Sequence, residues 1–210
     1  DVSEQITSLM AGYKMSIEEA DDALSGMAVV AAESASDLGE LANAEQKVAS
    51  AANTLGVSQD QLTAQLSTII SVTREAPETV GNSLKTIYAR LGDLKLGKTL
   101  EDNVNLGKVS GQLQGLGVQI LDTNGDMRAM GDILEDLMGK WKGFSAAQQQ
   151  AAAVALAGKY QYNNFMTLMS NSDMYYRQKQ TYNSSKGALD KQQDIYMESL
   201  QAKIQKLQTT

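Results

Sequence analysis

Asp122, Asn124 and Asp126 have the residue types and the spacing that open a calcium-binding loop. Such a loop places oxygen ligands at alternate positions, and the EF-hand pattern then continues with a glycine and, further on, a bidentate glutamate. This chain has Met127 and Ile133 at those two positions. Asp and Asn are also favoured in tight turns. We therefore interpret the three residues as turn residues and expect no metal site.

The residue types that the chain lacks restrict its chemistry further. It contains no Cys and no His, which excludes Cys- or His-based nucleophilic catalysis, a histidine general base and ordinary zinc sites. The adjacent carboxylates Glu135 and Asp136, like Glu18 and Glu19, are expected on solvated helix faces rather than around a substrate. The sequence therefore predicts a protein that is not an enzyme and holds no cofactor.

Composition and charge narrow the class of protein. Aromatic residues make up only 5% of the chain, which favours helices over strands. Residues 1–76 carry twelve acids and three bases, and residues 77–210 carry thirteen acids and fifteen bases. Neither part is basic enough to predict nucleic-acid binding. No apolar run approaches the ~20 residues that span a bilayer, so no membrane span is expected. Since the chain begins with Asp1 and ends inside a predicted helix, we expect a fragment of a longer protein.

Several local signals predict where helices begin and end. The capping-box pattern occurs at Ser16 with Glu19, Ser58 with Gln61, and Ser145 with Gln148. Pro77 predicts another helix start, and Gly56 predicts a left-handed cap at a helix end. These signals favour a mainly α protein.

Residues 118–128 form the one stretch that reads as sheet. Asn124-Gly125 is the pair that best suits a two-residue type I′ turn, so we predict a short β-hairpin with this pair as its structural turn. Directly after it, apolar residues recur at helical spacing and predict a helix that packs on the hairpin. These residues are Met130, Ile133, Leu134, Leu137, Met138 and Trp141.

Glycines are concentrated in the middle of the chain. Eleven of the seventeen lie between Gly81 and Gly143. Each glycine weakens a helix by roughly 1 kcal/mol relative to alanine, so we predict a loop at residues 92–105 and a short helix at 106–116. The expected architecture is two-lobed: an N-terminal helical lobe at 1–91, a glycine-rich connection at 92–117, and the hairpin with a C-terminal helical lobe at 118–210.

Two features of the C-terminal part predict interaction surfaces. Tyrosines gather at Tyr160, Tyr162, Tyr175 and Tyr182, and aromatic residues with polar tips are typical of protein interfaces. They are equally typical of a helical domain with few leucines. The last predicted helix, residues 188–208, has a coiled-coil-like seam, which a monomer would leave half exposed. The seam includes Met197, Leu200, Ile204 and Leu207.

Several motifs occur in a characteristic order over roughly residues 40–208. They are VGNSLKTI at 80–87 with ARL at 89–91, GVQILDTNGDMRAMGDIL at 117–134, KW at 140–141 with AAQQQ at 146–150 and ALAG at 155–158, and QQDIY at 192–196 with ESL at 198–200. In this order they resemble the core region of phage tail tape measure proteins. The resemblance is specific because the motifs are separate and ordered.

The resemblance implies a structural virion protein of a long-tailed phage or prophage. Such a protein lies in many copies inside the tail tube, acts as a scaffold for tail assembly, and sets tail length. The implied partners are tail assembly chaperones, tail tube and tail tip proteins, and further copies of the chain in the virion. The implied locations are the phage tail and, during assembly, the host cytoplasm. The alternatives are a helical secreted effector or adaptor and, with less support, a cell-wall hydrolase.

Overall fold

The computed structural model describes residues 2–93 and 105–184. This part of the chain is mainly helical, which confirms the predicted fold class. In order, the helices are α1 (Val2–Tyr13), α2 (Ile17–Glu33), α3 (Leu38–Thr54), α4 (Gln59–Thr73), α5 (Pro77–Gly92), α6 (Leu106–Gly115), α7 (Met130–Trp141), α8 (Ala146–Ser170) and α9 (Ser172–Ser184).

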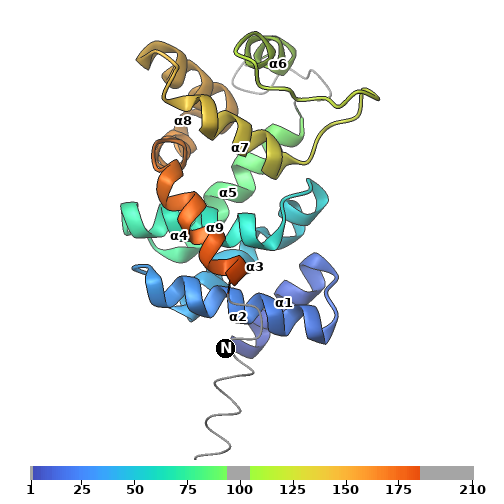
Figure 1. Ribbon diagram of the computed structural model, residues 1–210, viewed down its shortest axis with the longest axis vertical. Helices are drawn as coiled ribbons and strands as arrows, with labels where there is room; N and C mark the ends of the chain where they lie inside the picture. The colour runs from blue at the N-terminus through green and yellow to red at the C-terminus, as the bar shows by residue number, and fades with distance from the viewer. Residues whose placement is uncertain (1, 94–104, 185–210) are drawn as a thin grey trace, which may run out of the picture.

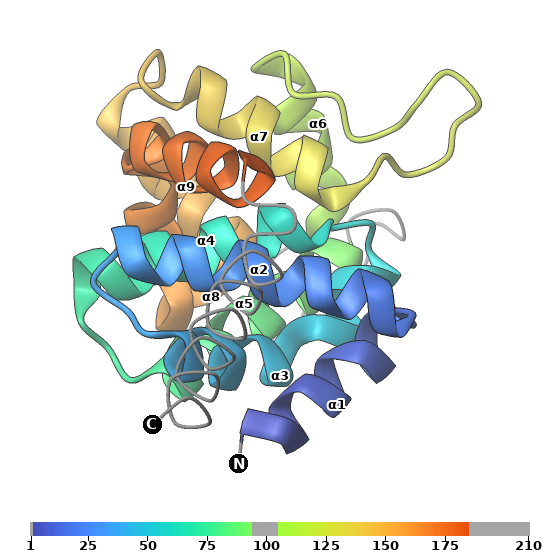
Figure 2. The same ribbon diagram turned by 60° about the horizontal axis from the view of Figure 1, so that its bottom comes forward.

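The helices are stacked from one end of the molecule to the other. Figures 1 and 2 show α1, α2 and α3 at the end that carries the N-terminus, and α6 and α7 at the opposite end. Between them lie α4, α5 and α9, with α9 returning to pack on α2 and α4. A buried apolar core runs through all of these layers.

The helix starts follow the signals read from the sequence. The capping boxes of Ser16 and Ser145 are formed, and Pro77 occupies the first turn of α5. At Ser58 the backbone amide donates to Oε1 of Gln61, while the Ser58 hydroxyl donates to Asp60. Gly56 has φ of 72°, as expected for a left-handed cap. A further capping box at Asp37, with Glu40 three residues later, starts α3. Its D-x-x-E pattern is also present in the sequence.

The central helix differs from its prediction. An apolar stripe at Leu62, Leu66, Ile69 and Ile70 predicts one buried face, but every residue from 61 to 70 is buried. The reason is tertiary: α2, α3, α5, α8 and α9 all contact α4 and leave no side for water. Polar side chains are therefore enclosed in the core.

The strand pairing of the hairpin is shorter than predicted, and its turn is of another type. Leu121 and Met127 form one antiparallel bridge. A two-residue type I′ turn requires positive φ at both Asn124 and Gly125, but of this pair only Gly125 has it, at 83°. The predicted turn type is therefore wrong. Instead, the Gly125 amide donates to the Asp122 carbonyl and the Asp122 amide donates to the Asp126 carbonyl, as in a type I turn followed by a glycine bulge. The Asp122 side chain stabilises this arrangement by accepting from the amides of Asn124 and Asp126.

α8 bends sharply at Gly158. This residue has φ of 74° and ψ of 170°, a conformation that only glycine adopts readily. The alanine-rich first half of α8 therefore ends at Gly158, although both halves continue as one element. Arg90 of α5 fills the bend: its Nη2 donates to the carbonyl of Ala155 at 3.0 Å. The guanidinium thus caps the first half of α8 from outside.

Three predictions are not settled by the fold. The coiled-coil-like helix at 188–208 lies outside the described residues, as does most of the predicted loop at 92–105. The division into two lobes stays a prediction. In the part of the chain that the structure covers, no helix combines the length and the apolarity that a membrane crossing requires.

Candidate interaction surface

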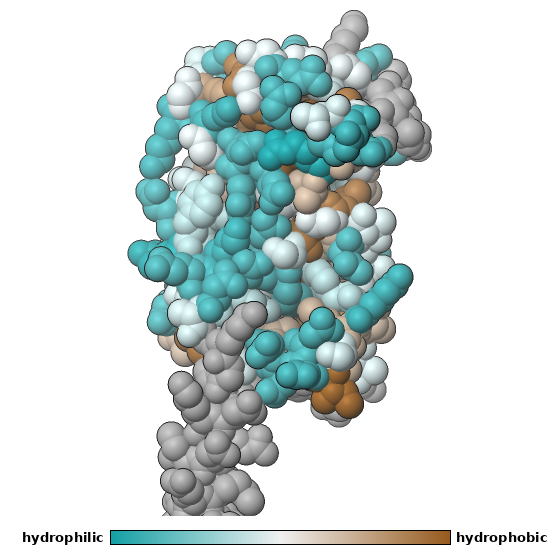
Figure 3. Space-filling view, turned by 45° about the vertical axis from the view of Figure 1, so that its right-hand side comes forward, coloured by the Kyte–Doolittle hydropathy of each residue, from teal (hydrophilic) through white to brown (hydrophobic). Residues whose placement is uncertain are grey.

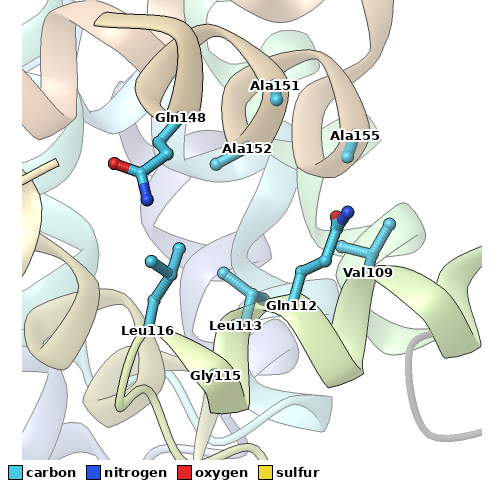
Figure 4. Close-up of a pocket in the computed structure, with 9 residues that line it drawn as sticks. All are labelled: Val109, Gln112, Leu113, Gly115, Leu116, Gln148, Ala151, Ala152 and Ala155. Atoms are coloured by element: carbon cyan, nitrogen blue, oxygen red, sulfur yellow. The ribbon is translucent and has the colours of Figure 1, made fainter. Parts of the chain in front are cut away.

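An apolar groove lies between α6 and the first half of α8. Figure 4 shows its two walls, with Leu113 and Leu116 on the side of α6 facing Ala151 and Ala152 of α8. Its volume is about 250 Å³. The full lining is Val109, Gln112, Leu113, Gly115, Leu116, Gln148, Ala151, Ala152 and Ala155. The groove exists because the alanines of α8 are too small to fill the space that the larger side chains of α6 leave.

Among the described residues, those that line the groove include no charged side chain. Gln112 and Gln148 supply its side-chain amides, and the other residues are apolar or glycine. A second, more open hollow continues along α8 over Ala147, Gln150 and Val154. Such a surface can bury apolar side chains, but it offers no acid, base or nucleophile. Its chemistry is that of packing and not of catalysis.

Figure 3 shows one face of the molecule, most of which is hydrophilic, with apolar atoms in separate patches. Large apolar side chains that reach the surface are few among the described residues. The most exposed are Ile17 and Tyr160, at 83% and 97%. Tyr160 follows the bend in α8 directly, so the bend sets the direction of its helix.

The structure divides the four candidate tyrosines. Tyr160 is exposed and Tyr162 is partly buried against the core, so both remain candidates for an interface. Tyr175 and Tyr182 are core residues, with 0% and 8% exposure, and they cannot belong to a surface in this fold. Their polar neighbours in the sequence suggested exposure, but α9 packs on α2 and α4.

Tyr175 is buried because its hydroxyl has a partner. It donates to Oε1 of Glu135 in α7 at 2.6 Å, and Nζ of Lys179 reaches the same oxygen at 2.6 Å. The pKa of Tyr175 is raised above its usual value, mainly by burial and to a smaller extent by the hydrogen bond to this carboxylate. Glu135 was expected on a solvated face. It instead fixes α9 to α7, and Gln61 of α4 adds a third donor at 3.3 Å.

Tyr182 is buried for a different reason. Its ring lies against Gly26 of α2, so closely that a Cβ at residue 26 would overlap the ring. The sequence does not indicate this contact, because Gly26 and Tyr182 are more than a hundred positions apart. Only a structure shows that the glycine faces the aromatic ring.

The remaining candidate site residues lie in the hairpin or outside the residues that the structure describes. Asn124 and Gly125 form part of the turn around Asp122, so the structural role of this stretch stands with the corrected turn type. In the described ranges, no group of three or more acids is placed to hold a metal ion. Met197, Leu200, Ile204 and Leu207 lie outside the described residues.

A family model described as "Phage-related minor tail protein" matches residues 1–158. No solved structure matches the chain. The matched range takes in α1 to α7 and the first half of α8, and it contains every residue that lines the groove. Tyr160 and Tyr162 follow it.

Proposed function

The chain belongs to the family of phage-related minor tail proteins, and from this premise we propose that it is a compact segment of a tape measure protein. Family membership gives it a structural role in the phage tail, where it contacts other tail components. It also favours a structural role over a secreted effector or a cell-wall hydrolase. The proposal adds that the full-length protein lies in the tail tube, is a scaffold for assembly, and sets tail length.

The observation that carries the proposal is the overlap between the family match and the ordered motifs. The motifs at 80–91, 117–134 and 140–158 all fall within the matched residues 1–158. Their order resembles that of the core region of tape measure proteins, which is a narrower group than minor tail proteins.

The fold suggests which part of a tape measure this segment is. A ruler must convert residues into length at a constant rate, and a continuous helix does so at about 1.5 Å per residue. Here α3 and α5 pack on one another, and α9 returns to α2 and α4, so added residues do not add length. We propose that the segment is a station that carries binding surfaces, and that the graduated ruler lies elsewhere in the parent protein.

The proposed partners follow from this role. During assembly in the host cytoplasm the segment would bind tail assembly chaperones, and in the virion it would contact tail tube and tail tip proteins and further copies of itself. An apolar segment of one of these tail components is the proposed occupant of the groove between α6 and α8. The absence of charge in the groove lining fits such an occupant.

In-frame deletions in the parent gene test the proposal. Deletions within residues 77–187 should prevent or derail tail assembly, because the described helices in this range, α5 to α9, contribute to one packed core. Heptad-sized deletions in a long, continuous helical part of the parent protein should give intact, shorter tails. Electron micrographs of virions from both sets provide the measurement. Intact tails that shorten in proportion to residues removed from 77–187 would show that this segment is part of the ruler. Normal tail length after every deletion would contradict the tape measure role itself.

A further inference from the structure

Glu45 of α3 is a carboxylic acid enclosed in the core. Its exposed fraction is 0%. One carboxyl oxygen lies 2.5 Å from Oγ1 of Thr63, and the other accepts a hydrogen bond from Nε2 of Gln59. Both partners belong to α4, so this carboxyl group joins α3 to the central helix.

The hydrogen-bond partners of Glu45 are neutral. Tyr13 from α1, Tyr88 from α5 and Tyr182 from α9 interact electrostatically with Glu45, and the acids Asp60 of α4 and Asp22 of α2 interact with Tyr182 in turn. Burial raises the pKa of each of these tyrosines above its usual value, so none is charged near neutral pH. From α2 the neighbour is Met27, whose sulfur lies 3.9 Å from the same Gln59 nitrogen. Within the described residues, no Lys or Arg forms an ion pair with Glu45.

An enclosed carboxylate without a cation is unfavourable, since burial removes its hydration and two neutral donors replace only part of it. The protonated acid suits the site better. A hydroxyl accepts as well as donates, so the acid proton can lie between the carboxyl oxygen and Thr63 Oγ1, while the other oxygen still accepts from Gln59. Burial raises the pKa of Glu45 to about 7, with the bonds from Thr63 and Gln59 acting in the opposite direction.

The polar interior next to this contact is incompletely hydrogen-bonded. In the described part of the chain, Oε1 of Gln59, Nε2 of Gln65 and Oγ1 of Thr68 are buried without a partner.

We propose that Glu45 is a proton-dependent latch between α3 and α4, closed while its carboxyl group is protonated and loosened when the group ionises. Ionisation places a charge where α1, α2, α5 and α9 also meet the pair, so the N-terminal helices lose packing stability together. The latch is a property of this fold and does not depend on the tape measure role.

The direction of the pH effect follows from linkage. The unfolded chain releases this proton near pH 4.5, whereas the folded chain retains it to about pH 7. The stabilisation is therefore complete below the lower value, falls between the two, and is absent above the higher one. The equilibrium constant for opening should rise on the order of 100-fold across this window because of this one group.

Glu45→Gln keeps the shape and the hydrogen-bonding capacity of the neutral acid but cannot ionise. The matched control is Glu18→Gln, because Glu18 is exposed on α2. Thermal melts and amide hydrogen exchange of α3 and α4 should be compared at about pH 5 and about pH 8. Wild type and the control should lose protection at the higher pH, and Glu45→Gln should lose clearly less. An equal loss in all three proteins would overturn the latch.

A second measurement needs no variant to fold. The side-chain carboxyl carbon of Glu45 can be followed by ¹³C NMR in the intact chain as pH is raised. We expect its transition well above that of the exposed glutamates. A transition at the ordinary value for glutamate would overturn the proposal whatever the variants show.

Discussion

Gly81 of α5 lies directly against the carbonyl group of Ala44 in α3. An added Cβ would overlap the Ala44 oxygen and would stand 3.1 Å from its carbonyl carbon and its Cα. The two backbones are thus in contact, and the obstacle to a side chain is main chain that cannot rotate away. Gly81 lies within the VGNSLKTI motif, so part of that motif is explained by close helix packing.

Gly81→Ala should therefore destabilise the protein, by about 1 to 3 kcal/mol as in other overpacked cores. Gly111→Ala is the matched control, since no atom lies within 4 Å of its would-be Cβ in α6. That variant should stabilise the fold slightly, by up to about 1 kcal/mol, because alanine is the better helix former. Urea unfolding of the two variants gives the measurement. Equal effects would mean that α3 and α5 can separate without loss.

Tyr175→Phe should destabilise the protein by about 1 to 3 kcal/mol, since it removes a buried donor from Glu135. Tyr160→Phe is the matched control and should change stability by less than about 0.5 kcal/mol, because Tyr160 is almost fully exposed. Thermal melts at one pH compare the two. If the variants melt alike, Glu135 does not fix α9.

Gly125→Val should destabilise the protein by about 1 to 2 kcal/mol, through the backbone alone. No atom lies within 4 Å of the added Cβ, but φ is 83° and a β-branched residue resists that conformation. Asn124→Ala should have a smaller effect, because the Asp122 side chain binds the Asn124 backbone amide and that amide is retained. Differential scanning calorimetry of both variants provides the test. Millimolar calcium should leave every midpoint unchanged, and a raised midpoint would restore the metal interpretation of this turn.

Ala151→Glu should leave the stability of the isolated chain nearly unchanged, because Ala151 is exposed. It should reduce tail assembly in the phage that encodes the chain, because it places a charge in an uncharged groove. Gln114→Glu adds the same charge to an exposed residue of α6 outside the groove lining and is the control. Plaque titre and electron micrographs measure assembly. Equal titres for the two variants would remove the groove from the proposed contacts.

Local signals were sufficient to predict most helix boundaries. A capping box such as Ser145 with Gln148 is formed by residues three positions apart, so both partners can be recognised within one short stretch of sequence. The same holds for Pro77 and Gly56, whose backbone preferences are intrinsic. These predictions needed no knowledge of what the helices pack against.

Burial of polar residues was not predicted because it depends on distant partners. Tyr175 meets Glu135 across forty positions, and Gln65 accepts from Tyr88 across twenty-three. Hydropathy assigns such residues to the surface, so the sequence pattern does not show that α4 is buried on all sides or that α9 packs on α2 and α4. The groove was missed for the same reason, since it depends on how α6 and α8 are placed relative to each other.

The bend at Gly158 coincides with the end of the family match, and this has a practical meaning for anyone who trims the chain. Core residues continue well past it: Phe165, Leu168, Met169, Tyr175 and Tyr182 all belong to the buried cluster. A protein ending at residue 158 would leave Glu135 without Tyr175 and Lys179, and α4 without the contact of α9. The stretch that defines the family by sequence is therefore shorter than the stretch that must be expressed to obtain a closed core.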